Sequence, residues 1–177
     1  MKLLLASLLV AASTIQNPAV HDPVMAYEDG TYYLYYTGTD IPVMTSTDLK
    51  NWNVSADGVL DNKIPAWVRD SVPGFKDQVW APDVIHYNGK WYMAYACSTF
   101  GKNTSTIGLL SNDKLADTKG WKDRGCIISS RAKRDNWNAI DPNFVIDDKG
   151  NPWLTWGSFW DGIQLIPLDK SMHVLKG

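Results

Sequence analysis

The fold is decided by one stretch of sequence, Pro82-Asp83-Val84-Ile85-His86-Tyr87-Asn88-Gly89-Lys90-Trp91-Tyr92-Met93-Ala94-Tyr95. Two runs rich in β-branched and aromatic residues flank the Asn88-Gly89 step. Such runs favour β-strands, and Asn-Gly readily adopts the positive φ angles of a two-residue hairpin turn. Residues 82–95 are therefore predicted to form a β-hairpin.

The same pattern occurs three times along the chain. His21–Tyr36 and Asp141–Trp156 repeat the order of strand, turn and strand, and the turn glycines Gly30, Gly89 and Gly150 are 59 and 61 residues apart. The positive φ that a hairpin demands is expected at each of these glycines. The chain is therefore predicted to consist of repeats of close to sixty residues.

A third strand with a polar corner follows each of the first two hairpins, at Val43–Asp48 and Ile107–Asp113. Each then leads to a tryptophan, Trp52 or Trp121, and a fourth strand. Four antiparallel strands per repeat are typical of a β-propeller blade. A single β-sandwich with chance similarity between hairpins is the alternative, but it does not explain why the third-strand corners recur as well.

The fold class is therefore predicted as all-β, with about two and three-quarter propeller blades at residues 15–75, 76–135 and 136–177. A propeller closes as a ring of four to eight blades. An arc of fewer than three cannot close, and it leaves hydrophobic blade faces at both ends.

Composition narrows the class of function. The chain has 177 residues with seventeen Lys and Arg against nineteen Asp and Glu, so no cationic surplus favours a nucleic-acid partner. Nine Trp and eight Tyr favour a β-rich fold and flat surfaces that stack on sugars. Of the acids, eighteen are Asp and only Glu28 is a glutamate.

The N-terminus has the layout of a secretory signal peptide. Lys2 precedes an apolar run, Leu3–Ala12, that is too short to span a bilayer, and small residues follow it. Residues 1–14 are therefore predicted to be a signal, with a secreted or periplasmic location and no membrane span; a buried N-terminal strand is the alternative. The strand map separates Cys97 from Cys126 by two sheet spacings, about 9–10 Å, so no disulfide is expected.

Two carboxylates are candidates for chemistry. The first strands of different blades start around one central axis, and Asp22 and Asp141 occupy equivalent places there, each followed by proline. Each could merely cap a turn, but their repetition beside aromatic residues favours a catalytic pair. Asp83 is offset by one position and is expected to be a structural hydrogen-bonding residue or a substrate contact. No zinc spacing, phosphate loop or Gly-x-Ser-x-Gly elbow occurs in the sequence.

A family resemblance rests on motifs in this order: His21-Asp22-Pro23, Trp80-Ala81-Pro82-Asp83, Ser98–Ser105, Asn138–Asn143, and Gly157-Ser158-Phe159-Trp160 closing with Gly162–Leu165. From about residue 20 onwards the chain resembles glycoside hydrolase family 43, and specifically its endo-1,5-α-L-arabinanases. The resemblance implies a five-bladed β-propeller that hydrolyses α-1,5-linked L-arabinan with inversion of configuration.

By that resemblance Asp22 is the general base that activates water, and Asp141 tunes the pKa of the general acid and orients it. Physical chemistry agrees, because inversion needs a base and an acid about 6.5–9.5 Å apart and a third carboxylate raises the pKa of the acid. Trp153 and Trp156, inside a strand, are expected in the core. The residues implied to bind substrate are Trp80, Phe100, Gly101, Asn138, Ser158, Phe159 and Trp160.

The general acid of the family is a glutamate in the blade after Asp141, and Glu28, at a hairpin turn, cannot replace it. The histidine with which many relatives hold calcium also lies beyond Gly177, so no metal or other cofactor is expected in this chain, although calcium belongs to the complete family fold. The chain is therefore expected to be the N-terminal portion of an arabinanase whose partners are arabinan and pectin side chains. A carbohydrate-binding propeller without catalysis, and an exo-acting arabinofuranosidase or β-xylosidase, are the alternatives.

Overall fold

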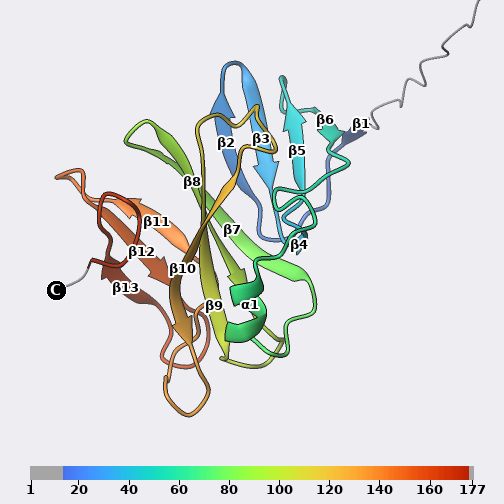
Figure 1. Ribbon diagram of the computed structural model, residues 1–177. Coiled ribbons are helices and arrows are strands. Elements are labelled where there is room, and N and C mark those ends of the chain that lie inside the picture. Colours follow the sequence, from blue (N-terminus) through green and yellow to red (C-terminus); the bar gives the residue numbers. More distant parts are fainter. Residues whose placement is uncertain (1–13, 176–177) are drawn as a thin grey trace, which may run out of the picture.

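The computed structural model describes residues 14–175, which form three antiparallel β-sheets in chain order. Figure 1 shows the second sheet lying between the first and the third. The predicted all-β fold class is confirmed, with one short helix, α1 (Ala66–Ser71), that the repeat pattern did not predict. The predicted signal lies outside the described residues except for Thr14, the first residue of β1. None of the described helices is long and apolar enough to cross a membrane.

The first sheet contains the four strands predicted for the first repeat and an additional edge strand. Its spatial order is β1-β6-β5-β3-β2, so the additional strand, β1, lies beside the fourth strand of the repeat. The strands are β1 (Thr14–Gln16), β2 (Val24–Glu28), β3 (Thr31–Tyr35), β5 (Val43–Ser46) and β6 (Asn51–Val54).

The second sheet includes one strand that belongs to the first repeat by sequence. Its order is β10-β9-β8-β7-β4, and β4 (Gly38–Thr39) pairs with Gln78 and Val79 of β7. The third sheet has the order β11-β12-β13. The remaining strands are β7 (Gln78–Tyr87), β8 (Lys90–Cys97), β9 (Ser105–Asn112), β10 (Lys122–Ser130), β11 (Asn143–Ile146), β12 (Pro152–Trp156) and β13 (Gln164–Pro167).

The hairpin turns follow the prediction in two repeats and differ in the third. Asp29-Gly30 and Asn88-Gly89 have positive φ at both residues, as a two-residue type I′ turn requires. In the third repeat five residues separate β11 from β12, and of these only Gly150 has positive φ. The Asp147 carboxylate shapes this longer turn by accepting hydrogen bonds from the backbone N–H groups two and four residues on.

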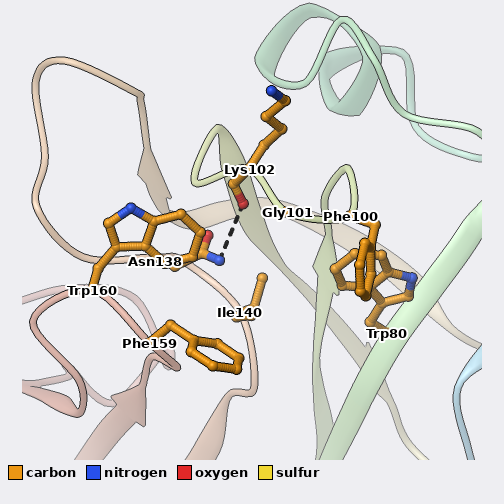
Figure 2. A pocket seen from close by; sticks show the side chains of 8 residues that line it. All are labelled: Trp80, Phe100, Gly101, Lys102, Asn138, Ile140, Phe159 and Trp160. Carbon is orange, nitrogen blue, oxygen red and sulfur yellow. Dashed lines mark hydrogen bonds between the residues drawn. The ribbon is translucent and has the colours of Figure 1, made fainter.

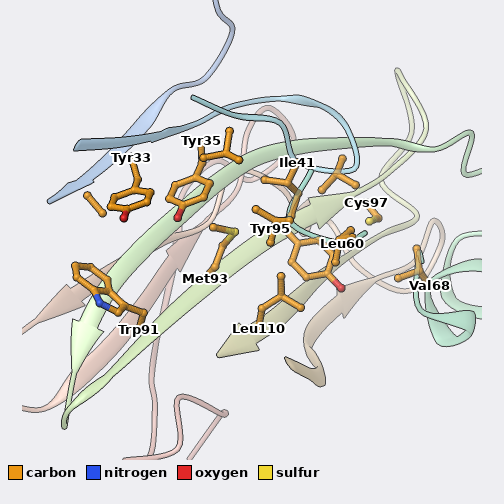
Figure 3. Packing of buried hydrophobic residues seen from close by; sticks show 14 of the residues in the cluster. Tyr33, Tyr35, Ile41, Leu60, Val68, Trp91, Met93, Tyr95, Cys97 and Leu110 are labelled. Atoms are coloured by element: carbon orange, nitrogen blue, oxygen red, sulfur yellow. The ribbon is translucent and has the colours of Figure 1, made fainter. Parts of the chain in front are cut away.

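Strand β8 is buried on both faces, which explains its uninterrupted apolar sequence. Alternate side chains pack against the first sheet and α1, as Figure 3 shows, while the others pack against the third sheet. Burial of each large apolar side chain stabilises the fold by about 1.5–3 kcal/mol. The side chains facing the first sheet are Trp91, Met93, Tyr95 and Cys97, and those facing the third are Tyr92, Ala94 and Ala96.

The arc is open at both ends within the described residues. Met25 and Tyr27 on β2 are 49% and 56% exposed, and Ile163 and Leu165 near β13 are 73% and 59% exposed. These are the hydrophobic blade faces expected of an incomplete ring. Cys97 and Cys126 lie on β8 and β10 with β9 between them and are both free, so the prediction of no disulfide is confirmed.

Carboxylates join each sheet to the next. The Trp91 indole N–H and the Leu115 backbone N–H donate to the two oxygens of Glu28, each over 2.6 Å. Between the second and third sheets, the Phe144 backbone N–H donates to Asp83 over 2.6 Å. Asp83 is therefore a structural hydrogen-bonding residue, which was one of its two predicted roles. Glu28 binds Trp91 and Leu115 at the far end of the hairpin from Asp22.

We expect Glu28→Gln to destabilise the protein. A glutamine offers one acceptor oxygen, so either Trp91 or Leu115 loses its partner and faces an N–H group instead. Losing a hydrogen bond to a charged group and leaving a donor unpaired costs about 1.5–3 kcal/mol. Chemical denaturation measures the loss, and Asp29→Asn, at the neighbouring turn residue with positive φ, is the matched control. Equal stability of the two variants would contradict the role of Glu28.

Candidate active site

The first strands of the three repeats begin with the same unusual backbone. Asp22, Ala81 and Asp141 each precede a proline, and their φ angles are 48°, 39° and 54°. Positive φ is uncommon and costly outside glycine, and such strain is concentrated at functional sites. The repeat therefore fixes three equivalent positions, of which the first and third carry carboxylates. Ala81 holds the equivalent place, so Asp83 is offset by two positions and not by the one position predicted from the sequence.

Asp22 and Asp141 line the same cleft, as their equivalent positions predicted. The cavity between them has a volume of about 630 Å³, and His21, Thr37 and Ser158 also line it. Two carboxylates from different repeats thus face one space that is open to solvent. This arrangement can activate a water molecule at one carboxylate while the other stays close enough to influence its surroundings.

Burial in the cleft raises the pKa of Asp141 above its ordinary value, and the negative charge of Asp22 raises it further. The nearby Ser158 hydroxyl and His21 lower this pKa, but their effects are weaker. Because Asp22 and Asp141 line one cavity, their like charges lie close enough to repel each other across the cleft.

Asp22 is held through one of its two oxygens. The Thr37 hydroxyl donates to Oδ2 over 2.6 Å, and Nδ1 of His21 lies 2.6 Å from the same atom. The Asp22 side chain is 38% exposed, so it remains accessible from the cleft. The sequence pattern did not reveal Thr37, because it follows the second strand of its hairpin and has no counterpart in a recognisable motif.

Aromatic side chains extend the cleft away from the carboxylates. A second cavity of about 490 Å³ shares Trp80, Phe100, Ile140 and Phe159 with the first, so the two form one continuous cleft. Figure 2 shows Trp80 and Phe100 on one side of the space and Phe159 and Trp160 on the other, with Ile140 between the two pairs. Phe100 is 91% and Phe159 83% exposed, which is unusual for phenylalanine and leaves both rings free to contact a ligand.

The structure brings all seven residues predicted to bind substrate to this cleft. Ser158 lines the part beside the carboxylates, and the second cavity contains the others together with Lys102 and Ile140, which the sequence did not single out. Trp156 is buried in the core, as predicted. The same prediction was wrong for Trp153, which is only half-buried because its indole N–H donates to Asp147 at the third hairpin turn. The six in the second cavity are Trp80, Phe100, Gly101, Asn138, Phe159 and Trp160.

Asn138 mainly supports the loop that carries Phe100 and Gly101. Its side chain is almost fully buried, its oxygen accepts a hydrogen bond from the Ser105 hydroxyl over 2.6 Å, and its amide donates to the Lys102 carbonyl over 3.3 Å. Figure 2 shows the bond to Lys102. Asn138 therefore contributes to the cleft chiefly by holding its wall.

A tight loop presents Phe159 and Trp160 to the cleft. The Gly157 backbone N–H donates to the carbonyl of Ile140 over 2.8 Å, and Gly157 has a φ of 114°. A side chain at this position would place its Cβ 2.3 Å from the carbonyl oxygen of Gly162. Only glycine fits this close backbone approach, which sets the direction of the two aromatic side chains.

Between residues 14 and 175 no group of three or more His, Cys, Asp or Glu side chains could hold a metal ion.

We expect Asp141→Asn to stabilise the protein at pH 7. Because the pKa of Asp141 is raised in the folded state, its ionised form is less stable there than in the unfolded chain. The gain from a neutral side chain should be present above the folded-state pKa and should vanish as the pH falls below the ordinary value of 3.8, where the aspartate is protonated in both states. Thermal unfolding at pH 7 and pH 3 measures it, with Asp148→Asn on the third hairpin turn as control; a lower stability of Asp141→Asn at pH 7 would contradict the prediction.

Comparison with known proteins places this chain in a family. The model for glycosyl hydrolases family 43 matches residues 13–177. The chain is 43% identical over 159 residues to an extracellular endo-α-(1→5)-L-arabinanase of Bacillus subtilis, covering 88% of this chain and 48% of the relative. It is 41% identical over 173 residues to an extracellular exo-α-(1→5)-L-arabinofuranosidase of Cellvibrio japonicus, covering 96% and 48%.

Comparison of the fold with solved structures gives similar proteins. The structure of an exo-1,5-α-L-arabinanase from a bovine ruminal metagenomic library superposes with a TM-score of 0.85 at 52% identity, covering 92% of this chain and 54% of that one. The chain thus spans about half the length of the proteins it matches. Because the family model covers nearly the whole sequence, the chain belongs to glycosyl hydrolases family 43.

Proposed function

We propose that the whole protein hydrolyses α-1,5-linked L-arabinan with inversion of configuration, and that these 177 residues contribute its base, its pKa modulator and one wall of its substrate cleft. The observation that carries the proposal is the convergence of Asp22 and Asp141 on a cleft with exposed aromatic rings. The names of the relatives support the substrate, because both the endo- and the exo-acting proteins act on α-1,5-linked arabinose.

Asp22 is proposed as the general base. Its side chain is accessible from the cleft, and an inverting glycosidase needs such a carboxylate to deprotonate the attacking water. Asp141, with its raised pKa, interacts with Asp22 and is proposed to keep the general acid protonated by adding negative charge beside it.

The general acid is proposed to lie outside residues 14–175. Glu28, the only glutamate of the sequence, uses both oxygens to bind Trp91 and Leu115 and does not line the cleft. Calcium, which the resemblance implies for the complete fold, is likewise proposed to be held by residues elsewhere in the protein.

The aromatic part of the cleft is suited to an uncharged polysaccharide. Trp80, Phe100 and Phe159 present apolar ring faces that can pack on the C–H faces of furanose rings, while Ser158 can bond a hydroxyl. The cleft continues from the carboxylates past these rings, so more than one sugar can bind on this side. We propose endo action on that basis, with exo action as the alternative that the relatives also represent, and an extracellular location like that named for both relatives.

We expect Asp22→Asn, made in the full-length protein, to lower kcat on debranched arabinan by at least 10²–10⁴-fold, because an essential general base is removed. Asparagine tolerates the positive φ at this position, so the melting temperature should change little. Release of reducing sugar measures the rate, and proton NMR of the first product gives its anomeric configuration. A retained configuration would contradict inversion. An inactive wild type that still binds arabinan would favour a carbohydrate-binding propeller instead.

We expect Phe100→Ala to weaken binding of arabinan about tenfold, which corresponds to about 1.4 kcal/mol of lost contact with the sugar faces. The ring is almost fully exposed, so stability should hardly change. Affinity electrophoresis in gels containing arabinan measures the binding, with Leu49→Ala, an exposed residue that does not line the cleft, as control. Equal migration of the two variants would remove Phe100 from the substrate site.

A further inference from the structure

We propose that Thr37 is a positioning residue for the base, orienting the Asp22 carboxylate so that Oδ1 faces the attacking water. This inference rests on the proposed function and adds to it a residue that no motif singled out. Thr37 lies between β3 and β4, where the chain leaves the first sheet for the edge of the second.

The backbone around Thr37 is fixed from two sides. Its N–H donates to the carbonyl of His21 over 3.0 Å, which joins it to the residue before Asp22. The next two residues form β4 and pair with β7 in the second sheet. Thr37 therefore has little freedom to move relative to either sheet, and it lines the cleft beside Asp22.

The hydroxyl of Thr37 has a defined hydrogen-bond direction. The Ala81 backbone N–H donates to Oγ1 of Thr37 over 2.8 Å, so Oγ1 acts as an acceptor there. An ionised Asp22 can only accept, so the hydroxyl proton points to Oδ2, which lies 2.6 Å away. A chain of two hydrogen bonds thus runs from the second sheet through Thr37 to the proposed base.

The Ala81 N–H can donate to Thr37 because the backbone at Ala81 leaves the regular strand pairing. Strand β7 is irregular here: its pairing with β8 passes from Trp80 directly to Asp83. Ala81 is skipped and has a φ of 39°, so its N–H is free to donate to Thr37. The strain repeated at position 81, where there is no carboxylate, thereby serves the carboxylate of Asp22.

The hydrogen bonds leave one oxygen of the base free. Thr37 and His21 both approach Oδ2, and no side chain or backbone group of residues 14–175 forms a hydrogen bond with Oδ1. Restricting Oδ2 fixes the rotation of the carboxylate and directs the unbonded Oδ1 into the cleft. Misplacement of a reacting group by about 1 Å costs on the order of 10²-fold in rate, so this restriction should act on turnover rather than on substrate binding.

The test compares Thr37→Val with Thr37→Ser in the full-length protein. Valine keeps the shape of threonine and removes the hydroxyl, whereas serine keeps the hydroxyl. We expect Thr37→Val to lower kcat on debranched arabinan about 10–100-fold with KM within about twofold of wild type. Thr37→Ser should keep kcat within about threefold of the wild-type value. Thr39→Val is the matched control, since Thr39 is exposed two residues away and does not line the cleft.

Rates are divided by the folded fraction from near-ultraviolet circular dichroism, so that a loss of folding is not counted as a loss of rate. The positioning role is overturned if Thr37→Val keeps kcat within threefold of wild type, if Thr37→Ser loses as much as Thr37→Val, or if only KM rises. A wild-type protein that releases no sugar from arabinan refutes the proposed function itself, and the role of Thr37 in that reaction falls with it.

Discussion

The structure depends on the burial of strand β8 from both sides. A strand at the middle of the arc must present apolar side chains on each face, and β8 does so, with Met93 and Tyr95 toward the first sheet and Ala94 and Ala96 toward the third. Large residues on one face and mainly small residues on the other set the distances at which the neighbouring sheets pack. Those distances in turn bring the starts of the first strands, and with them Asp22 and Asp141, to one cleft of this family 43 protein.

Several residues of the site hold a backbone conformation or a charge that is locally unfavourable. Asp22, Ala81 and Asp141 hold positive φ, and Asp141 keeps a carboxylate where burial and a like charge oppose ionisation. Bonds between neighbouring sheets, such as those of Glu28 and Asp83, stabilise the frame that maintains this strain.

The sequence was sufficient to predict the fold class, the hairpins and the equivalence of Asp22 and Asp141, because these depend on short-range turn chemistry and on repetition. It did not predict α1, which has no capping side chain and no acidic residue in its first turn. That helix is six residues long, and its Val68 is fully buried in the core between the first two sheets, so tertiary packing determines it. Thr37 was missed for a similar reason, since its role exists only once Ala81 of another repeat lies beside it.

Because of strand β4, the sequence repeats of this protein do not coincide with its sheets. Because Gly38 and Thr39 belong to the first repeat by sequence but to the second sheet by pairing, the first two repeats are interlocked rather than merely stacked. Ordinary repeat arrays gain and lose units one at a time, with stability close to a sum of nearest-neighbour terms. Here the first unit cannot separate without removing an edge strand from the second, so the two are expected to fold and unfold as one cooperative block, and duplication or deletion of a single repeat would leave a strand without its partner.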